Sequence, residues 1–318
     1  MLYLIEYEFD SVILYFSGGV IMFYENWMSC IKDDAKITKI AIPGAHNAGT
    51  RGMMPLGCCQ NGTLVEQFCY GVRKFGIRLK ANNKGKLFIA HGISKGITAD
   101  EAFRELAQIV NNYDDFIILD IRTYPAQGIG PFHFKYQSDA SDVDKLIEKY
   151  LNPEKYAFTD FDDIKNVTLG DIRCSGKKYI ILNAKKEYKY SCDCQLLEPW
   201  DPKVFGLKPE AFVKENLKYL RDLESDGFFW FQSQQTPNFG TEIGIKTPKK
   251  LDEMGRPLFP GMMAEIAADP KMLEKVNIVA GDFMTRDHMK SNEILAFNLL
   301  KGVVKDEKIA EYSAAIGK

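Results

Sequence analysis

Short, continuously apolar segments alternate along this chain with longer amphipathic segments. Residues 116–119, 179–182 and 228–231 lack the polar–apolar alternation of a strand with one wet face. Such runs are typical of parallel strands that are covered on both faces. We predict strands over residues 37–42, 74–79, 87–90, 116–121, 179–183, 228–231 and 277–281.

The segments between the strands have the apolar period of helices that cover a sheet. Residues 98–113 begin with a capping box, Thr98-x-x-Glu101, and Pro209 stands at a favoured first-turn position. We predict helices over 98–113, 142–151, 209–220 and 291–303, and long loops over 51–62, 124–138, 184–207 and 233–262. Strand–helix alternation with about seven strands predicts an α/β fold and favours a closed barrel over an open sheet.

No internal repeat or Pro/Ser-rich linker divides the chain, so we expect one domain over residues 25–318. Residues 1–24 are expected to be an N-terminal extension that is either not native or poorly packed. The apolar run at 11–24 is shorter than the ~18 residues of a spanning helix. Glu6, Glu8 and Asp10 precede it, where a secretory signal carries positive charge. We therefore expect neither a membrane anchor nor a signal peptide.

Composition narrows the function classes. A formal net charge of −2 gives no reason to expect a nucleic-acid partner, which normally requires a basic face. Seven cysteines show none of the spacings of a zinc site, and their odd number argues against a disulfide framework. We therefore expect the cysteines to be core or incidental thiols.

Polar residues stand at or near the ends of the predicted strands. In a parallel barrel, active-site groups cluster at the carboxyl ends of the strands, so these residues would meet at one rim. A single such residue has a structural explanation, since His46 can be a satisfied structural histidine and Asp282 a helix cap. The whole set is harder to explain in that way: His46, Arg78, His91, Arg122, Asn183, Lys185, Gln232 and Asp282.

These residue types together suit one kind of chemistry. Two imidazoles can act as general base and general acid, because the ordinary pKa of histidine, near ~6.5, allows either role. An arginine offers a forked, permanently charged donor to phosphate oxygens. A carboxylate behind a histidine fixes its tautomer and stabilises its charged form. The set predicts cleavage of a phosphodiester by an internal hydroxyl, with arginine in place of a metal ion.

The chain resembles the bacterial phosphatidylinositol-specific phospholipases C, within the wider X-domain superfamily. The two most specific stretches are WMSCIKDDAKITKIAIPGAHNAGT and TLVEQFCYGVRKFGIRLKANNKGKLFIAHG. Three supportive stretches follow in the same order: DDFIILDIRTY, VTLGDIRCSGKKYIILN and NIVAGDF. The resemblance covers most of residues 27–283 and implies a distorted, single-domain TIM-type barrel over 25–318.

The resemblance also implies residue roles. His46 corresponds to the general base, Asp282 to its carboxylate partner, Arg78 to the phosphate-binding arginine and His91 to the general acid. It implies a phosphatidylinositol diacylglycerol-lyase that releases diacylglycerol and a cyclic inositol phosphate. Arg122 is placed near the phosphate, and Asp201 and Asn183 are candidates for binding the inositol ring.

Two positions depart from the family's pattern. Asn47 follows His46 where the family usually has aspartate, and Gly76 stands where the family usually has an acidic residue. Eukaryotic relatives hold calcium there with carboxylates, so we expect an enzyme that needs no metal and no other cofactor. The alternatives are a phosphodiesterase acting on another phospholipid or glycerophosphodiester head group, and a phosphoinositide-binding protein that has lost turnover.

The substrate class implies the partners. A phospholipid substrate requires peripheral contact with a membrane surface, for which the aromatic residues Phe132, Phe134 and Trp200 are candidates. We predict no protein partner. The resemblance implies an extracellular enzyme, whereas the N-terminus is not signal-like, so the sequence leaves the compartment open.

Overall fold

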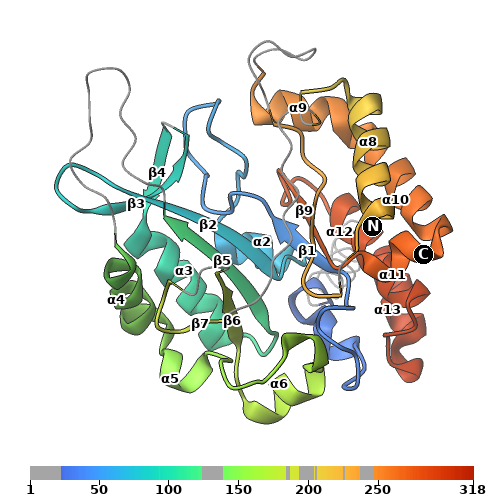
Figure 1. Ribbon diagram of the computed structural model, residues 1–318, viewed down its shortest axis with the longest axis horizontal. Helices are drawn as coiled ribbons and strands as arrows, with labels where there is room; N and C mark the ends of the chain where they lie inside the picture. The colour runs from blue at the N-terminus through green and yellow to red at the C-terminus, as the bar shows by residue number, and fades with distance from the viewer. Residues whose placement is uncertain are drawn as a thin grey trace, which may run out of the picture.

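The computed structural model describes residues 23–92, 94–123, 139–183, 187–192, 204, 206–224, 226–236 and 246–318. These residues form one nine-stranded sheet, in which a path of parallel neighbours runs β7-β6-β5-β2-β1-β9-β8 (Figure 1). The strands are β1 (Ile42–Ala45), β2 (Lys74–Ala81), β3 (Leu87–His91), β4 (Ser94–Thr98), β5 (Ile117–Thr123), β6 (Tyr179–Leu182), β7 (Ser191–Cys192), β8 (Trp230–Gln232) and β9 (Ile278–Gly281).

Helices flank this sheet, with α3 and α4 at one side and α8 to α11 gathered at the other (Figure 1). The described helices are α2 (Leu64–Cys69), α3 (Ala99–Asn112), α4 (Ala140–Leu151), α5 (Pro153–Tyr156), α6 (Leu169–Ser175), α8 (Pro209–Asp222), α9 (Pro248–Gly255), α10 (Phe259–Ala268), α11 (Pro270–Lys275), α12 (Met289–Leu300) and α13 (Ile309–Ile316). Short 3-10 turns are η1 (Trp27–Cys30), η2 (Ile164–Asn166), η3 (Arg256–Leu258) and η4 (Asp306–Lys308).

Successive residues of the central strands enter two different cores. Ile117 and Leu119 of β5 pack outward with the helices, whereas Ile118 packs inward with Ile180 and Trp230. Both faces of the strands are therefore buried, which explains why the runs are continuously apolar. The predicted α/β fold of TIM type is confirmed.

The sheet is more distorted than the predicted closed barrel. The segment at 87–90 is a strand, but β3 runs antiparallel to β2 and pairs with β4, so the two form a hairpin. Neither β4 nor β7 was predicted. Within the described residues no ladder joins β7 to β8, the two ends of the path. The result is a curled half-barrel.

Two other predictions were wrong in their details. Residues 37–40 form a turn, and the strand begins only at Ile42, because side-chain amides bond this backbone. Asn298 accepts from the N–H of Ala41 and donates to its carbonyl, and Asn277 donates to the carbonyls of Ile37 and Ile40. Ile37 and Ile40 are apolar because they lie in the inner core. The predicted loop over 233–262 contains α9, η3 and the start of α10.

The four predicted helices are present as α3, α4, α8 and α12. Thr98 caps α3 by accepting from the backbone of Glu101, and Pro209 opens α8. No described helix is long and apolar enough to span a membrane. Phe23 and Tyr24, which the sequence analysis placed in the extension, are buried.

Candidate active site

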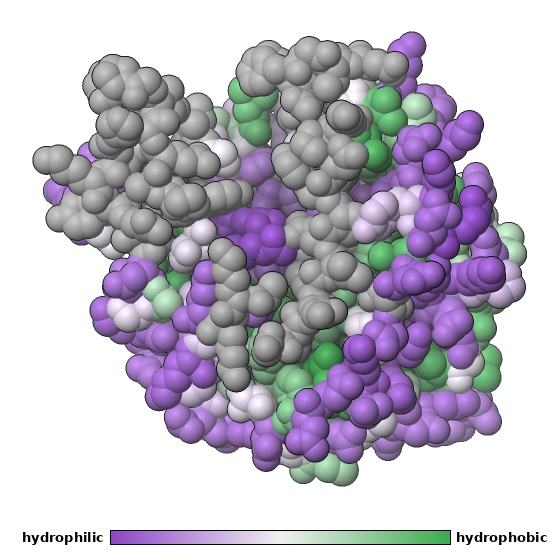
Figure 2. Space-filling model, viewed as in Figure 1, coloured by the Kyte–Doolittle hydropathy of each residue, from purple (hydrophilic) through white to green (hydrophobic). Residues whose placement is uncertain are grey.

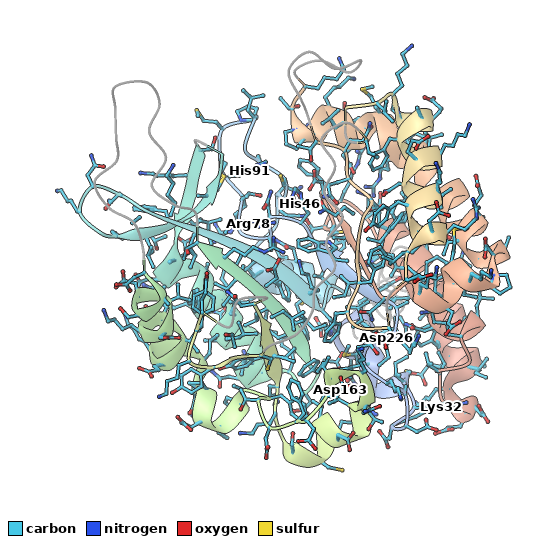
Figure 3. All side chains as sticks on the ribbon, viewed as in Figure 1. Lys32, His46, Arg78, His91, Asp163 and Asp226 are labelled. Carbon is cyan, nitrogen blue, oxygen red and sulfur yellow. The ribbon has the colours of Figure 1, made fainter. Side chains whose placement is uncertain are left out.

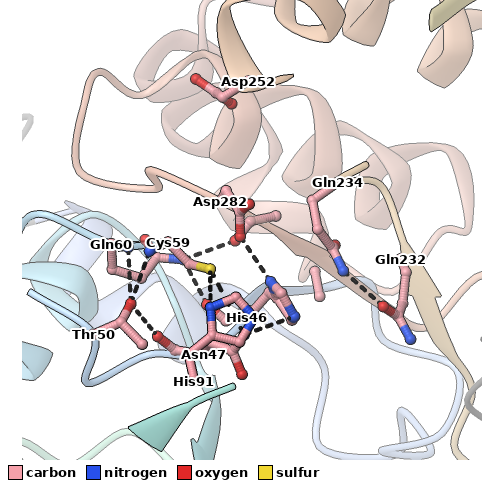
Figure 4. A network of polar contacts seen from close by, with 12 residues as sticks. His46, Asn47, Thr50, Cys59, Gln60, His91, Gln232, Gln234, Asp252 and Asp282 are labelled. Carbon is pink, nitrogen blue, oxygen red and sulfur yellow. Dashed lines mark hydrogen bonds and ion pairs between the residues drawn. The ribbon is translucent and has the colours of Figure 1, made fainter. Parts of the chain in front are cut away.

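The carboxyl ends of β1 and β9 place His46 beside Asp282. The strands are parallel neighbours in which Ala45 pairs with Gly281, so the residue after each strand emerges at the same level. His46 Nδ1 lies 2.8 Å from Asp282 Oδ1, and the two side chains are 12% and 3% exposed (Figure 4). Burial raises the pKa of the Asp282 carboxyl well above its usual range, and the charge of Lys290 opposes this. The fold thus joins residues 236 positions apart.

Asn47 fixes the tautomer of His46. Its amide Nδ2 lies 3.0 Å from His46 Nε2. Because an amide nitrogen can only donate, Nε2 accepts and the ring proton is on Nδ1, facing Asp282. The amide oxygen of Asn47 accepts from Arg78 Nε at 3.4 Å. Asn47 has a φ of +46°, a left-handed conformation that asparagine tolerates better than most residues.

The hairpin of β3 and β4 brings His91 to the same rim. We expected His91 at the carboxyl end of a parallel strand, and this expectation was wrong because β3 runs antiparallel to β2. The ring of His91 lies 6.1 Å from that of His46, centroid to centroid, at 84°. His91 Nδ1 donates to the carbonyl of Gly57 at 3.0 Å, which leaves Nε2 as the nitrogen that can exchange a proton. Burial and the nearby charge of His46 lower the pKa of His91.

Inside the half-barrel, β2 and β5 carry a charged cluster in which Arg122 was predicted as a site residue and Lys74 and Asp120 were not. Asp120 lies between Lys74 Nζ, at 3.2 Å, and Arg122 Nε, at 2.8 Å. Lys74 is fully buried and also lies over the ring of Trp230. Although burial opposes ionisation, the charges of Lys74, Arg122 and Arg78 hold the pKa of Asp120 at about 2. An acidic residue within the buried run FIILDIR was the signal for it.

The ladder also sets two arginines side by side. Arg78 of β2 and Arg122 of β5 occupy directly paired positions, and Gly76 is paired with Asp120. Like charges opposite each other on neighbouring strands destabilise a sheet unless an anion lies between or above them. The Asp120 carboxylate balances part of the charge of the two arginines, and the rim remains suited to an anionic ligand.

The loop after β1 ties the site together. Gln60 is fully buried, and its amide donates to the carbonyls of His46 and Gly281 at 3.0 and 2.9 Å. Thr50 Oγ1 donates to Asn47 O at 2.8 Å and accepts from the backbone of Cys59 and Gln60 (Figure 4). The same side chains therefore fix both ends of the His46–Asp282 pair.

The predicted site residues are placed as follows. Figure 3 shows His46, Arg78 and His91 close together at the rim, and Figure 2 shows a hydrophilic hollow in that part of the same view. Asn183 follows the last residue of β6 and is half-buried, one strand beyond Arg122. Asp201, Lys185, Phe132, Phe134 and Trp200 lie outside the described residues.

Cys59 is a further site residue that was not predicted from the sequence. Its Sγ lies 3.5 Å from His91 Nδ1 and 3.6 Å from Asn47 Nδ2. Nothing in the cysteine spacing indicated this position, because the contacts depend on how the loop folds back. Among the described residues, His46, Cys59 and Asp282 have ligand atoms close enough to hold a metal ion.

Comparisons with known proteins agree with this fold. No protein-family model matches the chain, and no curated protein matches its sequence. The phosphatidylinositol-specific phospholipase C from Listeria monocytogenes superposes with a TM-score of 0.60 at 17% identity, covering 86% of this chain and 98% of that one. A Staphylococcus aureus phosphatidylinositol-specific phospholipase C gives 0.58 at 15% identity, covering 86% and 97%. The chain therefore has the fold of these solved bacterial structures.

Proposed function

We propose that this chain cleaves the phosphodiester of phosphatidylinositol without a metal ion, by attack of the adjacent inositol hydroxyl on phosphorus. The products are diacylglycerol and a cyclic inositol phosphate. The observation that carries the proposal is the meeting of the His46–Asp282 pair with His91 at a ring distance of 6.1 Å, beside Arg78. The names of the solved structures that share the fold support the choice of head group.

His46 is the proposed general base. Its Nε2 carries the lone pair, because Nδ1–H faces Asp282. The attacking hydroxyl displaces the Asn47 amide from Nε2 and transfers its proton there as the new P–O bond forms. The imidazolium that results is stabilised by the carboxylate of Asp282.

The two paired arginines are the proposed phosphate site. A guanidinium donates in a fork that matches phosphate oxygens and stays charged at every working pH. Arg78 adjoins Asn47 at the rim, and Arg122 is held by Asp120 one strand away. Their charge takes the role that a metal ion has in related chemistry. Asn183 and Asp201 are the proposed residues for binding the inositol ring.

His91 is the proposed general acid. When protonated at Nε2 it can donate to the glycerol oxygen as the P–O bond to diacylglycerol breaks, and it ends neutral. The lowered pKa of His91 makes its protonated form a stronger acid. Proton exchange with water then deprotonates His46 and reprotonates His91 for the next turnover.

Contact with a lipid surface has support at the same rim. Met54 and Leu56 are 60% and 56% exposed on the loop whose Gly57 accepts from His91. Exposed apolar side chains beside the site suit peripheral binding to the headgroup region.

Binding without turnover is a second function that one observation favours. The Asn47 amide occupies Nε2 of His46, the atom that the proposed reaction needs. A protein of that kind would keep the arginines and bind the lipid, with no release of a cyclic product.

The test is to incubate the purified protein with phosphatidylinositol vesicles, with and without EDTA, and to identify the soluble product by phosphorus NMR. We expect a cyclic inositol phosphate in both samples. Loss of product with EDTA would instead favour a metal-dependent phosphodiesterase. Binding to the vesicles with no product would favour the second function.

Three histidine variants assign the roles. His46→Ala and His91→Ala are expected to abolish product while the circular-dichroism spectrum is retained. His288→Ala is the matched control, since its ring stacks between Tyr24 and Tyr70 away from the site. It is expected to lower the melting temperature and keep the product. Product release by either site variant at the wild-type rate would refute the acid–base roles.

A further inference from the structure

Three different metal-ligating groups converge at the base of the site. His46, Cys59 and Asp282 offer ligand atoms that all lie within 4.8 Å of one another. The proposed reaction gives Cys59 no task, although its side chain is buried against the Asn47 amide and the proposed general acid, His91. A side-chain hydrogen bond also joins the thiol to Asp282.

The spacing suits a small transition-metal ion. Zinc bonds of roughly 2.0–2.3 Å to nitrogen, oxygen and sulfur place tetrahedral ligand atoms about 3–4 Å apart. His46 Nδ1 and Asp282 Oδ1 are already 2.8 Å apart, so an ion requires only small shifts of these two groups and of Cys59. Sulfur and imidazole ligands select zinc or cobalt over calcium and magnesium.

The surrounding charges leave the carboxylate available. Lys290 Nζ donates to the carbonyl oxygen of Asp282 at 2.6 Å and to the carboxylate of Asp252 at 2.5 Å. The lysine charge is therefore met by Asp252, and the Asp282 carboxylate faces His46 and Cys59. Asn47 Nδ2, 3.6 Å from the sulfur, is placed to donate to a thiolate.

We propose that Cys59, His46 and Asp282 bind one thiophilic divalent cation of the zinc class, and that this ion inhibits the enzyme. On binding, the Cys59 thiol releases its proton to solvent and the His46 ring proton moves from Nδ1 to Nε2. Nε2 can then no longer accept a proton from substrate, and Asp282 no longer pairs with the imidazole. The inhibition rests on the proposed function, whereas the binding does not.

Cobalt reports the binding directly. Chelator-treated protein is titrated with Co²⁺ alone, and a thiolate-to-cobalt charge-transfer band is expected to saturate near one equivalent. Zn²⁺ is expected to displace the band. Cys59→Ser should abolish it, while Cys58→Ser, whose half-buried thiol faces Gln60 O, should keep it. A band that survives in Cys59→Ser, or no band in the wild type, would overturn the site.

A second ligand variant and an inhibition assay complete the test. His46→Ala keeps every cysteine, so loss of the band in a folded His46→Ala protein supports the cluster even if Cys59→Ser does not fold, and an unchanged band refutes it. In the vesicle assay, Zn²⁺ should inhibit wild type and Cys58→Ser at least tenfold more strongly than Cys59→Ser. A cobalt band without zinc inhibition would overturn the inhibitory role. If no cyclic product forms at all, the proposed function fails while the cobalt titration still decides the site.

Discussion

Replacing Asp120 by asparagine removes a carboxylate that pairs with both Lys74 and Arg122 inside the half-barrel. The pKa of Asp120 is lowered from 3.8 to about 2, and each unit is worth about 1.4 kcal/mol, so its ionisation stabilises the fold by about 2 kcal/mol at neutral pH. Breaking a buried ion pair by removing one partner costs more, about 3–5 kcal/mol. We expect Asp120→Asn to lower the free energy of unfolding by an amount between these two values.

Because the pKa of Asp120 is lowered in the folded protein, acid reduces the stability that its ionisation provides. The stabilisation is complete above pH ~4, the range of an unfolded aspartate, and is lost as pH falls through about 2. The assay is urea unfolding at pH 7 and at pH 3. The difference in unfolding free energy between wild type and Asp120→Asn should be smaller at pH 3. Asp226→Asn is the matched control, because Asp226 pairs with Lys165 at 2.8 Å but is 71% exposed and lies far from the rim (Figure 3). Its urea midpoint should hardly change. Equal midpoints for the two variants would refute the reasoning.

Two further pairs of variants test the site and the packing beneath it. Asn47→Asp is expected to raise turnover in the vesicle assay up to about tenfold, because a charged acceptor strengthens the contact with Arg78. Asn47→Gly is the control: glycine also tolerates the positive φ but adds no charge, so turnover should not rise. Equal rates for the two variants would show that the site does not use a charge at position 47. Gly76→Ala is expected to cost about 1–3 kcal/mol, since its Cβ would lie 3.3–3.4 Å from Ala45 O, Lys74 Nζ and Trp230. Gly261→Ala in α10, with open space around it, should gain up to about 1 kcal/mol in the same urea assay, and a loss there would contradict the helix argument.

The sequence predicted the parallel strands because both of their faces are buried, and burial shows directly in composition. The runs at Ile118 and Ile180 are apolar on every residue for this reason. Residues 37–40 contain Ile37 and Ile40 yet form a turn, because the side-chain amide of Asn277 bonds the carbonyls of both residues. Local pattern cannot distinguish a strand from a buried turn when the partner is a side chain over two hundred residues away.

The candidate site was predictable where a residue directly follows a parallel strand. His46 and Asp282 are such residues, and the register of β1 with β9 brings them together. His91 reaches the rim by the β3–β4 hairpin, whose antiparallel direction the sequence did not reveal. Cys59 and Gln60 were missed because a loop has no period from which its side-chain directions follow.

The two departures from the family's pattern have different structural consequences. A Cβ at position 76 would lie 3.3 Å from Ala45 O and in contact with Lys74 and Trp230, so a longer acidic side chain there would have to displace these neighbours. Asp120, paired with Gly76 on the next strand, supplies a carboxylate at the same level of the half-barrel. Its carboxylate oxygens pair with the side chains of Lys74 and Arg122. Asp120 therefore positions these two basic side chains and does not offer its oxygens as ligands to an ion such as calcium. At position 47, by contrast, the amide contacts both the proposed base and Arg78, and no described carboxylate replaces its missing charge there. Position 47 is therefore where this chain's rate and substrate choice should differ most from those of enzymes that carry aspartate.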